Sequence, residues 1–107
     1  NSVAQVAALA ALDDKEHIKK TQKNNREGMK YLKKELIRLE LEFVPSAANF
    51  VLFRSPIDAG KLYQRLLRKG VIVRPMSGYK LPQWLRVTIG TPAENKRFIK
   101  ALTEVLE

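Results

Sequence analysis

Hydrophobic and polar positions alternate most clearly in residues 84–91, Trp-Leu-Arg-Val-Thr-Ile-Gly-Thr. A period of two predicts a half-buried β-strand. One face carries Leu85, Val87 and Ile89, and the opposite face carries Trp84, Arg86 and Thr88. Packed apolar neighbours are expected to fix the backbone at Arg86 while its guanidinium points away from the core. A guanidinium mounted in this way is suited to bidentate binding of a carboxylate or a phosphate.

The remaining elements follow from apolar periodicity and from capping signals. Residues 91–94, Thr-Pro-Ala-Glu, predict a helix start with an N-cap hydroxyl, a proline at the first position and a capping-box glutamate. Gly70 is suited to end the preceding helix. Strands are predicted at 41–44, 49–54, 71–74 and 84–89, and helices at 2–12, 13–42, 56–69 and 92–106. This order predicts an α+β fold, in which a small, mostly antiparallel sheet carries helices on one face.

The two N-terminal helices differ in their apolar patterns. Residues 2–12 are rich in alanine and leucine and apolar nearly all round, so this helix needs burial on several sides and is expected to meet a partner surface. The second helix has its large apolar residues near one stripe, at Ile18, Met29, Leu32, Leu36 and Leu39. Because 19–28 contains none, its first half is expected to bridge solvent or another domain. Gly28 is expected to weaken it by about 1 kcal/mol relative to alanine.

Composition and charge narrow the possible functions. The length of 107 residues suits one domain, and the opening at Asn1, inside a helical pattern, suggests a piece of a longer protein. The absence of cysteine excludes a disulfide and a thiol nucleophile. The net charge of +9 raises nucleic acid as a partner, but much of it comes from nine cations between Lys15 and Arg38. These lie mostly opposite the apolar stripe, which favours a solvated helix face.

Two arginines are the candidates for binding chemistry. Arg74 ends one predicted strand, and Arg86 lies inside the next, beyond a loop at 75–83. If the strands are antiparallel neighbours, both guanidiniums can line one pocket, whereas spacing alone favours two surface arginines in ordinary ion pairs. Nucleophilic catalysis has no candidate, because the only histidine is His17 on the basic helix and no serine lies in an elbow motif. A glycine-rich phosphate loop is also absent.

Three segments carry a resemblance to a known family. They are residues 1–12 (Asn-Ser-Val-Ala-Gln-Val-Ala-Ala-Leu-Ala-Ala-Leu), 45–52 (Pro-Ser-Ala-Ala-Asn-Phe-Val-Leu) and 70–91, which contains the Val-Arg and Leu-Arg-Val-Thr-Ile-Gly-Thr motifs. The chain resembles the C-terminal small domain of histidinol-phosphate aminotransferases. The resemblance implies a cytoplasmic, homodimeric, pyridoxal-phosphate-dependent enzyme of the aspartate aminotransferase fold, acting in histidine biosynthesis. Such enzymes interconvert histidinol phosphate and 2-oxoglutarate with imidazole acetol phosphate and glutamate.

The resemblance also implies roles for individual residues. Arg86 matches the family arginine that pairs with the substrate's carboxylate or phosphate. Arg74 matches a second arginine near that anionic end of the substrate, and Asn49 matches a supporting position near the same pocket. Lys80 departs from the family, in which many members have glycine. The cofactor-binding lysine and the other catalytic groups are implied to lie in a large domain before Asn1. The chain alone is therefore expected to hold neither cofactor nor metal and to be inactive, with residues 1–40 as interdomain and interface helices and 41–107 as the core.

Two alternatives compete with this interpretation. One is a threonine-phosphate decarboxylase or another aminotransferase of the same superfamily, since these enzymes share the Arg86-type anchor. The other is a small basic α+β module that binds RNA, which needs exposed aromatic side chains on the sheet to stack bases. Phe50 and Phe53 are predicted on opposite faces of one strand, and Trp84 is alone. The aromatic platform is therefore weak, and the expected partners are small-molecule substrates and the large domain rather than nucleic acid or a membrane.

Overall fold

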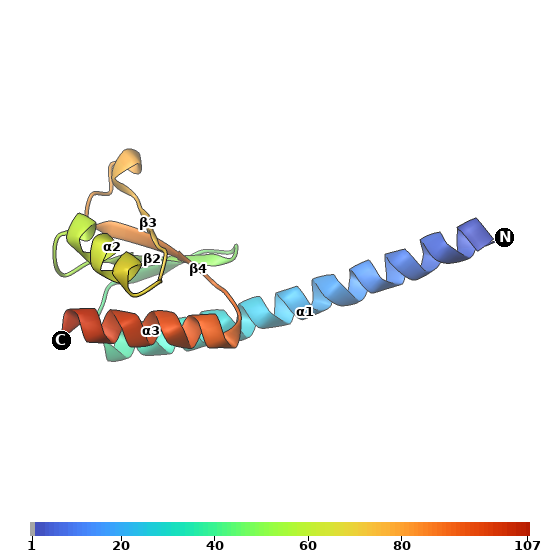
Figure 1. Ribbon diagram of the computed structural model, residues 1–107, viewed down its shortest axis with the longest axis horizontal. Helices are drawn as coiled ribbons and strands as arrows, with labels where there is room; N and C mark the ends of the chain where they lie inside the picture. The colour runs from blue at the N-terminus through green and yellow to red at the C-terminus, as the bar shows by residue number, and fades with distance from the viewer. Residues whose placement is uncertain (1) are drawn as a thin grey trace.

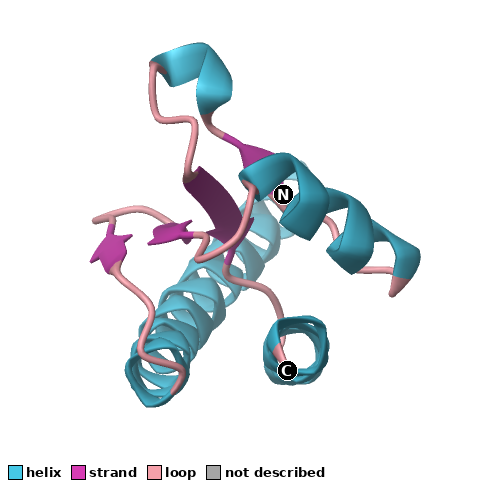
Figure 2. Cartoon of the chain, turned by 90° about the vertical axis from the view of Figure 1, so that its left-hand side faces the viewer, coloured by secondary structure: helices cyan, strands magenta, loops and turns pink. Residues whose placement is uncertain are grey.

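The computed structural model describes residues 2–107, and it describes side chains from residue 15 onward. The elements are α1 (Ser2–Arg38), β1 (Phe43–Pro45), β2 (Phe50–Arg54), α2 (Ala59–Arg68), β3 (Arg74–Pro75), the 3₁₀ turn η1 (Ser77–Tyr79), β4 (Trp84–Thr88) and α3 (Pro92–Leu106). The strands form one antiparallel sheet in the order β1-β2-β4-β3. The helices gather on one side of the sheet (Figure 2). The predicted α+β class is confirmed.

The core lies between the inner face of the sheet and the three helices. The sheet contributes Val51, Phe53, Leu85 and Val87, and the helices contribute Leu32, Leu36, Leu62, Leu66, Phe98 and Leu102. The rings of Phe53 and Phe98 meet edge to face, with centroids 5.6 Å apart. Leu85, Val87 and Ile89 are all buried, which confirms the alternation predicted for this strand. The outer face of β4 therefore carries Trp84, Arg86 and Thr88.

Local capping signals were predicted correctly. The Thr91 hydroxyl accepts a hydrogen bond from the Glu94 N–H, and the Glu94 carboxylate accepts one from the Thr91 N–H, so the capping box at the start of α3 is complete. At the end of α2, Gly70 adopts a φ of 79°. Its N–H donates to the Leu67 carbonyl, and the N–H of Val71 donates to the Leu66 carbonyl, which is a Schellman motif.

The predicted division of the N-terminal region into two helices was wrong. Residues 2–38 form the single helix α1, because the aspartates at 13 and 14 cost a helix interior less than about 1 kcal/mol each and do not break it. The helix ends at Arg38 rather than Glu42. Glu40 takes a φ of 59°, and the N–H of Leu41 donates to the Leu36 carbonyl. This is again a Schellman motif, formed without the usual glycine.

The predicted strand at 71–74 was also too long. Only Arg74 and Pro75 pair with β4. The N–H of Val71 is already used to cap α2, and the side chains of Val71 and Val73 are buried in the core rather than displayed on a regular strand. Ile72 is left 77% exposed. The edge of β4 beyond Arg86 therefore has no neighbouring strand on this side.

Helix α1 extends far beyond the rest of the molecule (Figure 1). With this helix included, the longest dimension is 61 Å. The side chains of residues 15–23 are exposed, including the apolar Ile18, whereas Leu32 and Leu36 are fully buried. These positions confirm that only the second half of the helix packs on the core. The predicted apolar contact surface at 2–12 lies outside the residues whose side chains are described.

Gly28 is the point of closest approach between α1 and the turn that follows β4. A Cβ atom at this position would lie 2.4 Å from Ile89 Cγ2 and 2.9 Å from Asn95 Nδ2. Side chains from α1 and α3 hold the same turn through Gly90. Asn24 on α1 donates to the Gly90 carbonyl at 2.9 Å, and Asn95 on α3 donates to the same carbonyl at 3.2 Å. Asn95 Oδ1 also accepts the Gly90 N–H at 2.9 Å. Gly28 therefore allows a close contact, in addition to weakening the helix.

Replacing Gly28 with alanine is expected to lower the free energy of unfolding by up to about 2 kcal/mol. The added methyl group overpacks the contact at a cost of about 1–3 kcal/mol, and a gain of about 1 kcal/mol in helix propensity offsets part of that cost. Urea denaturation of the chain measures the difference. Gly78→Ala is the control, since a Cβ at 78 meets no atom within 4 Å. A Gly28→Ala variant as stable as the parent would contradict the close packing.

The capping box makes part of the stability depend on pH. The hydrogen bond from the Thr91 backbone lowers the pKa of Glu94 below its ordinary value of 4.5. A carboxyl group with a lowered folded-state pKa stabilises the protein above its unfolded pKa, and this contribution is lost as pH falls through the folded pKa. Glu94→Gln is thus expected to be less stable than the parent at neutral pH and to approach it below pH 4.5. Urea denaturation across this range tests the expectation, and a constant deficit would refute it.

Candidate functional site

Arg74 and Arg86 occupy directly opposite positions on β3 and β4. Residues paired in this way in an antiparallel sheet point to the same face, with Cβ atoms about 4.5–5.5 Å apart. The neighbours of Arg86 on β4, Leu85 and Val87, point into the core. Both arginines therefore lie on the outer face, away from the helices. The expectation that antiparallel pairing brings them together is confirmed.

A cavity of about 380 Å³ lies beside the pair. Its lining residues are Tyr63, Ile72, Val73, Arg74, Pro75, Arg86 and Thr88. Tyr63 comes from α2, and the others come from β4, from β3 and from the segment that leads into β3. Because residues 71–73 do not pair with β4, the cavity runs along the uncovered edge of that strand. We call it the arginine cavity.

The arginine cavity is positively charged. Its lining contains two guanidiniums and no carboxylate. The ion pairs among residues 15–107 are Lys23–Glu27, Arg38–Glu35, Arg54–Glu42 and Lys69–Glu104. Neither Arg74 nor Arg86 belongs to these pairs, so no ion pair within residues 15–107 engages either guanidinium. Like charges opposite each other in a sheet repel, and an anion bound between them removes that repulsion.

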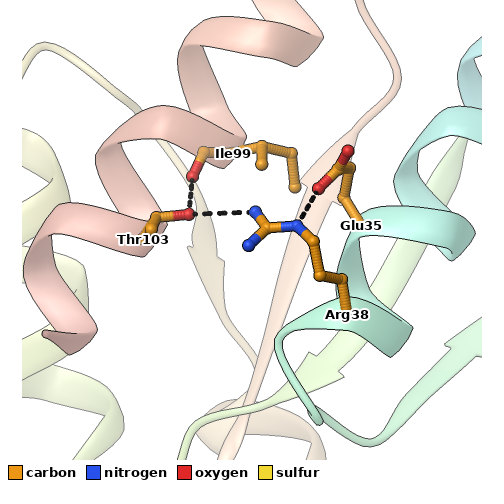
Figure 3. Close-up of polar contacts among 4 residues, drawn as sticks. All are labelled: Glu35, Arg38, Ile99 and Thr103. Carbon is orange, nitrogen blue, oxygen red and sulfur yellow. Dashed lines mark hydrogen bonds and ion pairs between the residues drawn. The ribbon is translucent and has the colours of Figure 1, made fainter.

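Arg38 shows how an arginine of this chain is neutralised internally. Its Nε donates to the Glu35 carboxylate one turn earlier in α1, and its Nη2 lies 3.5 Å from the hydroxyl of Thr103 on α3 (Figure 3). That hydroxyl in turn donates to the Ile99 carbonyl at 2.7 Å. Two of the three guanidinium nitrogens of Arg38, Nε and Nη2, thus have acceptors within the fold. No such acceptor from a side chain of residues 15–107 engages Arg74 or Arg86.

Arg86 has one side-chain partner that sequence reasoning missed. The Cζ atom of Arg86 lies 5.3 Å from the centroid of the Phe50 ring, a cation–π distance. Phe50 pairs with Thr88 across β2 and β4, which makes it a diagonal neighbour of Arg86 on the outer face. Alternation within 50–54 predicts the face of Phe50, but the pairing register that brings it to Arg86 is not visible in the sequence. Phe53 is fully buried.

Asn49 does not line the arginine cavity. Its carbonyl accepts the Ile89 N–H at 2.7 Å, and the residue borders a separate cavity of about 660 Å³ between the loop before β2 and helix α1. Three cations of α1, Arg26, Lys30 and Lys33, line that second cavity. The structure therefore brings together two of the three candidate residues.

Lys80, the departure from the family pattern, adopts a φ of 62°, a conformation that glycine favours.

Neither a metal-binding cluster nor a helix able to cross a membrane is found in the described part of the chain. No group of histidine, cysteine, aspartate and glutamate side chains there is arranged to hold a metal ion. No described helix combines the length and the apolar character needed to cross a membrane. The arginine cavity is thus the arrangement with the clearest chemistry: it can bind an oxyanion through charge-assisted hydrogen bonds.

Comparison with known proteins places this geometry in a family. The family model of aminotransferase class I and II matches residues 1–102. A histidinol-phosphate aminotransferase of Akkermansia muciniphila is 50% identical over 105 residues, which are 97% of this chain and 28% of that protein. The chain therefore spans less than a third of the length of this relative.

Solved structures agree on the fold. The histidinol-phosphate aminotransferase from Clostridium acetobutylicum superposes with a TM-score of 0.79 at 26% identity, over 88% of this chain and 30% of that one. An L-threonine-O-3-phosphate decarboxylase from Porphyromonas gingivalis superposes with a TM-score of 0.68 at 31% identity, over 83% of this chain and 28% of that one. The chain belongs to the aminotransferase class I and II family.

Proposed function

We propose that this chain is the C-terminal small domain of a histidinol-phosphate aminotransferase, in which Arg86 and Arg74 bind the anionic groups of the substrates. The observation that carries the proposal is the pair of arginines at directly opposite strand positions on the outer face of the sheet, lining one cavity that contains no carboxylate. Histidinol phosphate presents a phosphate, and 2-oxoglutarate and glutamate present carboxylates. A guanidinium stays charged at any physiological pH and matches both groups with paired N–H donors.

The residues of the arginine cavity do not fit pyridoxal phosphate. A site for this cofactor needs a lysine that can bond to its aldehyde and an acid that can face its pyridine nitrogen, and the lining contains neither. In our proposal the cofactor is bound by the large domain, which also supplies the catalytic residues. The contribution of this chain is to bind and orient the substrate.

The domain division that we propose places residues 1–40 as interdomain and interface helices and 41–107 as the α+β core. Two observations support it: the side chains of residues 15–23 are exposed on a helix that extends away from the sheet, and the A. muciniphila relative is more than three times as long as this chain. The second half of α1 packs on the core and links the two parts. A homodimer and a cytoplasmic location complete the proposal for the intact enzyme.

The chain by itself is expected neither to bind pyridoxal phosphate tightly nor to transaminate. An absorbance titration of the purified chain with the cofactor, followed by a glutamate-formation assay, tests both statements. The intact enzyme, treated in the same way, is the positive control. Saturable binding at equal concentrations of cofactor and chain would show that a cofactor site exists within these residues.

Arg86→Lys in the intact enzyme is expected to lower kcat/KM for histidinol phosphate by a factor of about 10 to 150. The loss of the bidentate contact removes about 1.5–3 kcal/mol of transition-state binding. Steady-state kinetics measure the effect. Arg54→Lys is the matched control, because Arg54 lies on the same sheet but is exposed and paired with Glu42 at 3.5 Å. An unchanged kcat/KM for the Arg86 variant would reject the assignment.

A threonine-phosphate decarboxylase is the second candidate. The superposition on the P. gingivalis enzyme supports it, because that protein shares the fold at 31% identity over most of this chain. Both candidate substrates carry a phosphate that the arginine pair can bind, so the residues of this chain do not separate them. Assays of the intact enzyme with histidinol phosphate and with threonine phosphate distinguish the two reactions directly.

A further inference from the structure

Among the side chains of residues 15–107, an aromatic ring and no carboxylate engages the guanidinium of Arg86. Its Cζ atom lies 5.3 Å from the Phe50 ring centroid, and both residues are half-buried on the outer face. A carboxylate partner would accept the N–H donors of the guanidinium, as Glu35 does for Arg38. An aromatic ring attracts the cation through its π face and leaves these donors available. The contact therefore fixes the charge without consuming the groups that bind an oxyanion.

The Phe50 ring also counteracts the repulsion between Arg86 and Arg74. Arg74 lies directly opposite Arg86, on the strand away from β2, whereas Phe50 lies on β2. A long, flexible arginine side chain beside a like charge tends to swing away into solvent. Attraction to Phe50 keeps the guanidinium over the sheet, on the side of β4 away from Arg74. The two arginines can then approach one anion from two sides.

The backbone of Phe50 is itself held firmly. Its carbonyl accepts two hydrogen bonds from Ser46, one from the hydroxyl at 2.7 Å and one from the N–H at 3.3 Å. The preceding residue, Asn49, accepts the Ile89 N–H at 2.7 Å, which ties the start of β2 to the end of β4. The segment Pro-Ser-Ala-Ala-Asn-Phe thus forms a turn that places the ring at a defined position next to Arg86.

We infer that Phe50 is a positioning residue for Arg86: its ring sets the place of the guanidinium on the outer face, where the N–H donors meet the substrate anion. This role rests on the proposed function of Arg86. It assigns the Asn-Phe pair at 49–50 a physical task, in which Asn49 anchors the strand through its backbone and Phe50 supplies the ring.

The test uses the intact enzyme, with inorganic phosphate as a competitive inhibitor and histidinol phosphate as substrate. Phe50→Leu removes the ring but keeps an apolar side chain, and it is expected to raise both the inhibition constant for phosphate and KM by about threefold to tenfold, with a smaller change in kcat. Phe50→Tyr keeps the ring and is expected to stay within about twofold of the parent. Val44→Ala, on the same outer face but on β1 and not paired with Arg86, is the control for loss of apolar surface.

A double-mutant cycle with Arg86→Ala shows whether Phe50 acts through Arg86 or affects phosphate binding independently of it. If Phe50 acts through Arg86, Phe50→Leu has no further effect on phosphate inhibition once Arg86 is alanine. Equal losses in the presence and absence of Arg86, or a Phe50→Tyr variant as impaired as Phe50→Leu, would overturn the positioning role while leaving Arg86 as the anion-binding residue. If Arg86→Ala leaves phosphate inhibition unchanged, the proposed function itself fails. Circular dichroism of each variant confirms that the comparison is made between folded proteins.

Discussion

Two arginines, Arg74 and Arg86, occupy directly paired positions on β3 and β4, and the packing of the sheet must offset the repulsion between their like charges. Like charges at paired sheet positions destabilise by about 0.2–1 kcal/mol. On the inner face of the same strand, Leu85 and Val87 are buried, and each buried apolar side chain of this kind contributes about 1.5–3 kcal/mol. Packing therefore outweighs repulsion on β4. The buried inner face therefore fixes the position of β4, and the side chains on its outer face are available for binding.

The short third strand also leaves part of β4 open for binding. If residues 71–73 continued β3 along β4, the edge beside Thr88 would be covered and the arginine cavity would be narrower. Instead, the N–H of Val71 caps α2, and Val73 turns into the core. Backbone that would otherwise extend the sheet is used to end a helix. The uncovered edge is a consequence of the Schellman motif at Gly70, one of the features most clearly encoded in the sequence.

Features that depend on neighbours in the chain were predictable, and features that depend on pairing between distant segments were not. The alternation around Arg86, the capping box at Thr91 and the helix end at Gly70 each rest on a few adjacent residues. The approach of Phe50 to Arg86 depends on strand register, and the placement of Asn49 at a separate cavity depends on the packing of α1. Glu40 in a left-handed conformation carries no sequence signal, because glycine is the residue expected there. The arginine pair was predictable only on the condition that the strands were antiparallel neighbours.

The contact at Gly28 links the arginine cavity to the long helix. Asn24 on α1 donates to the Gly90 carbonyl, and Gly90 lies four residues after Arg86, just beyond the end of β4. A rotation of α1 at this point would break that hydrogen bond and drive the backbone of Gly28 against Ile89, whose Cγ2 atom leaves no room even for a methyl group. These contacts hold α1 against the turn after β4 from Asn24 onward. On the domain division that we propose, the direction of α1 then decides where the two guanidiniums lie relative to the large domain.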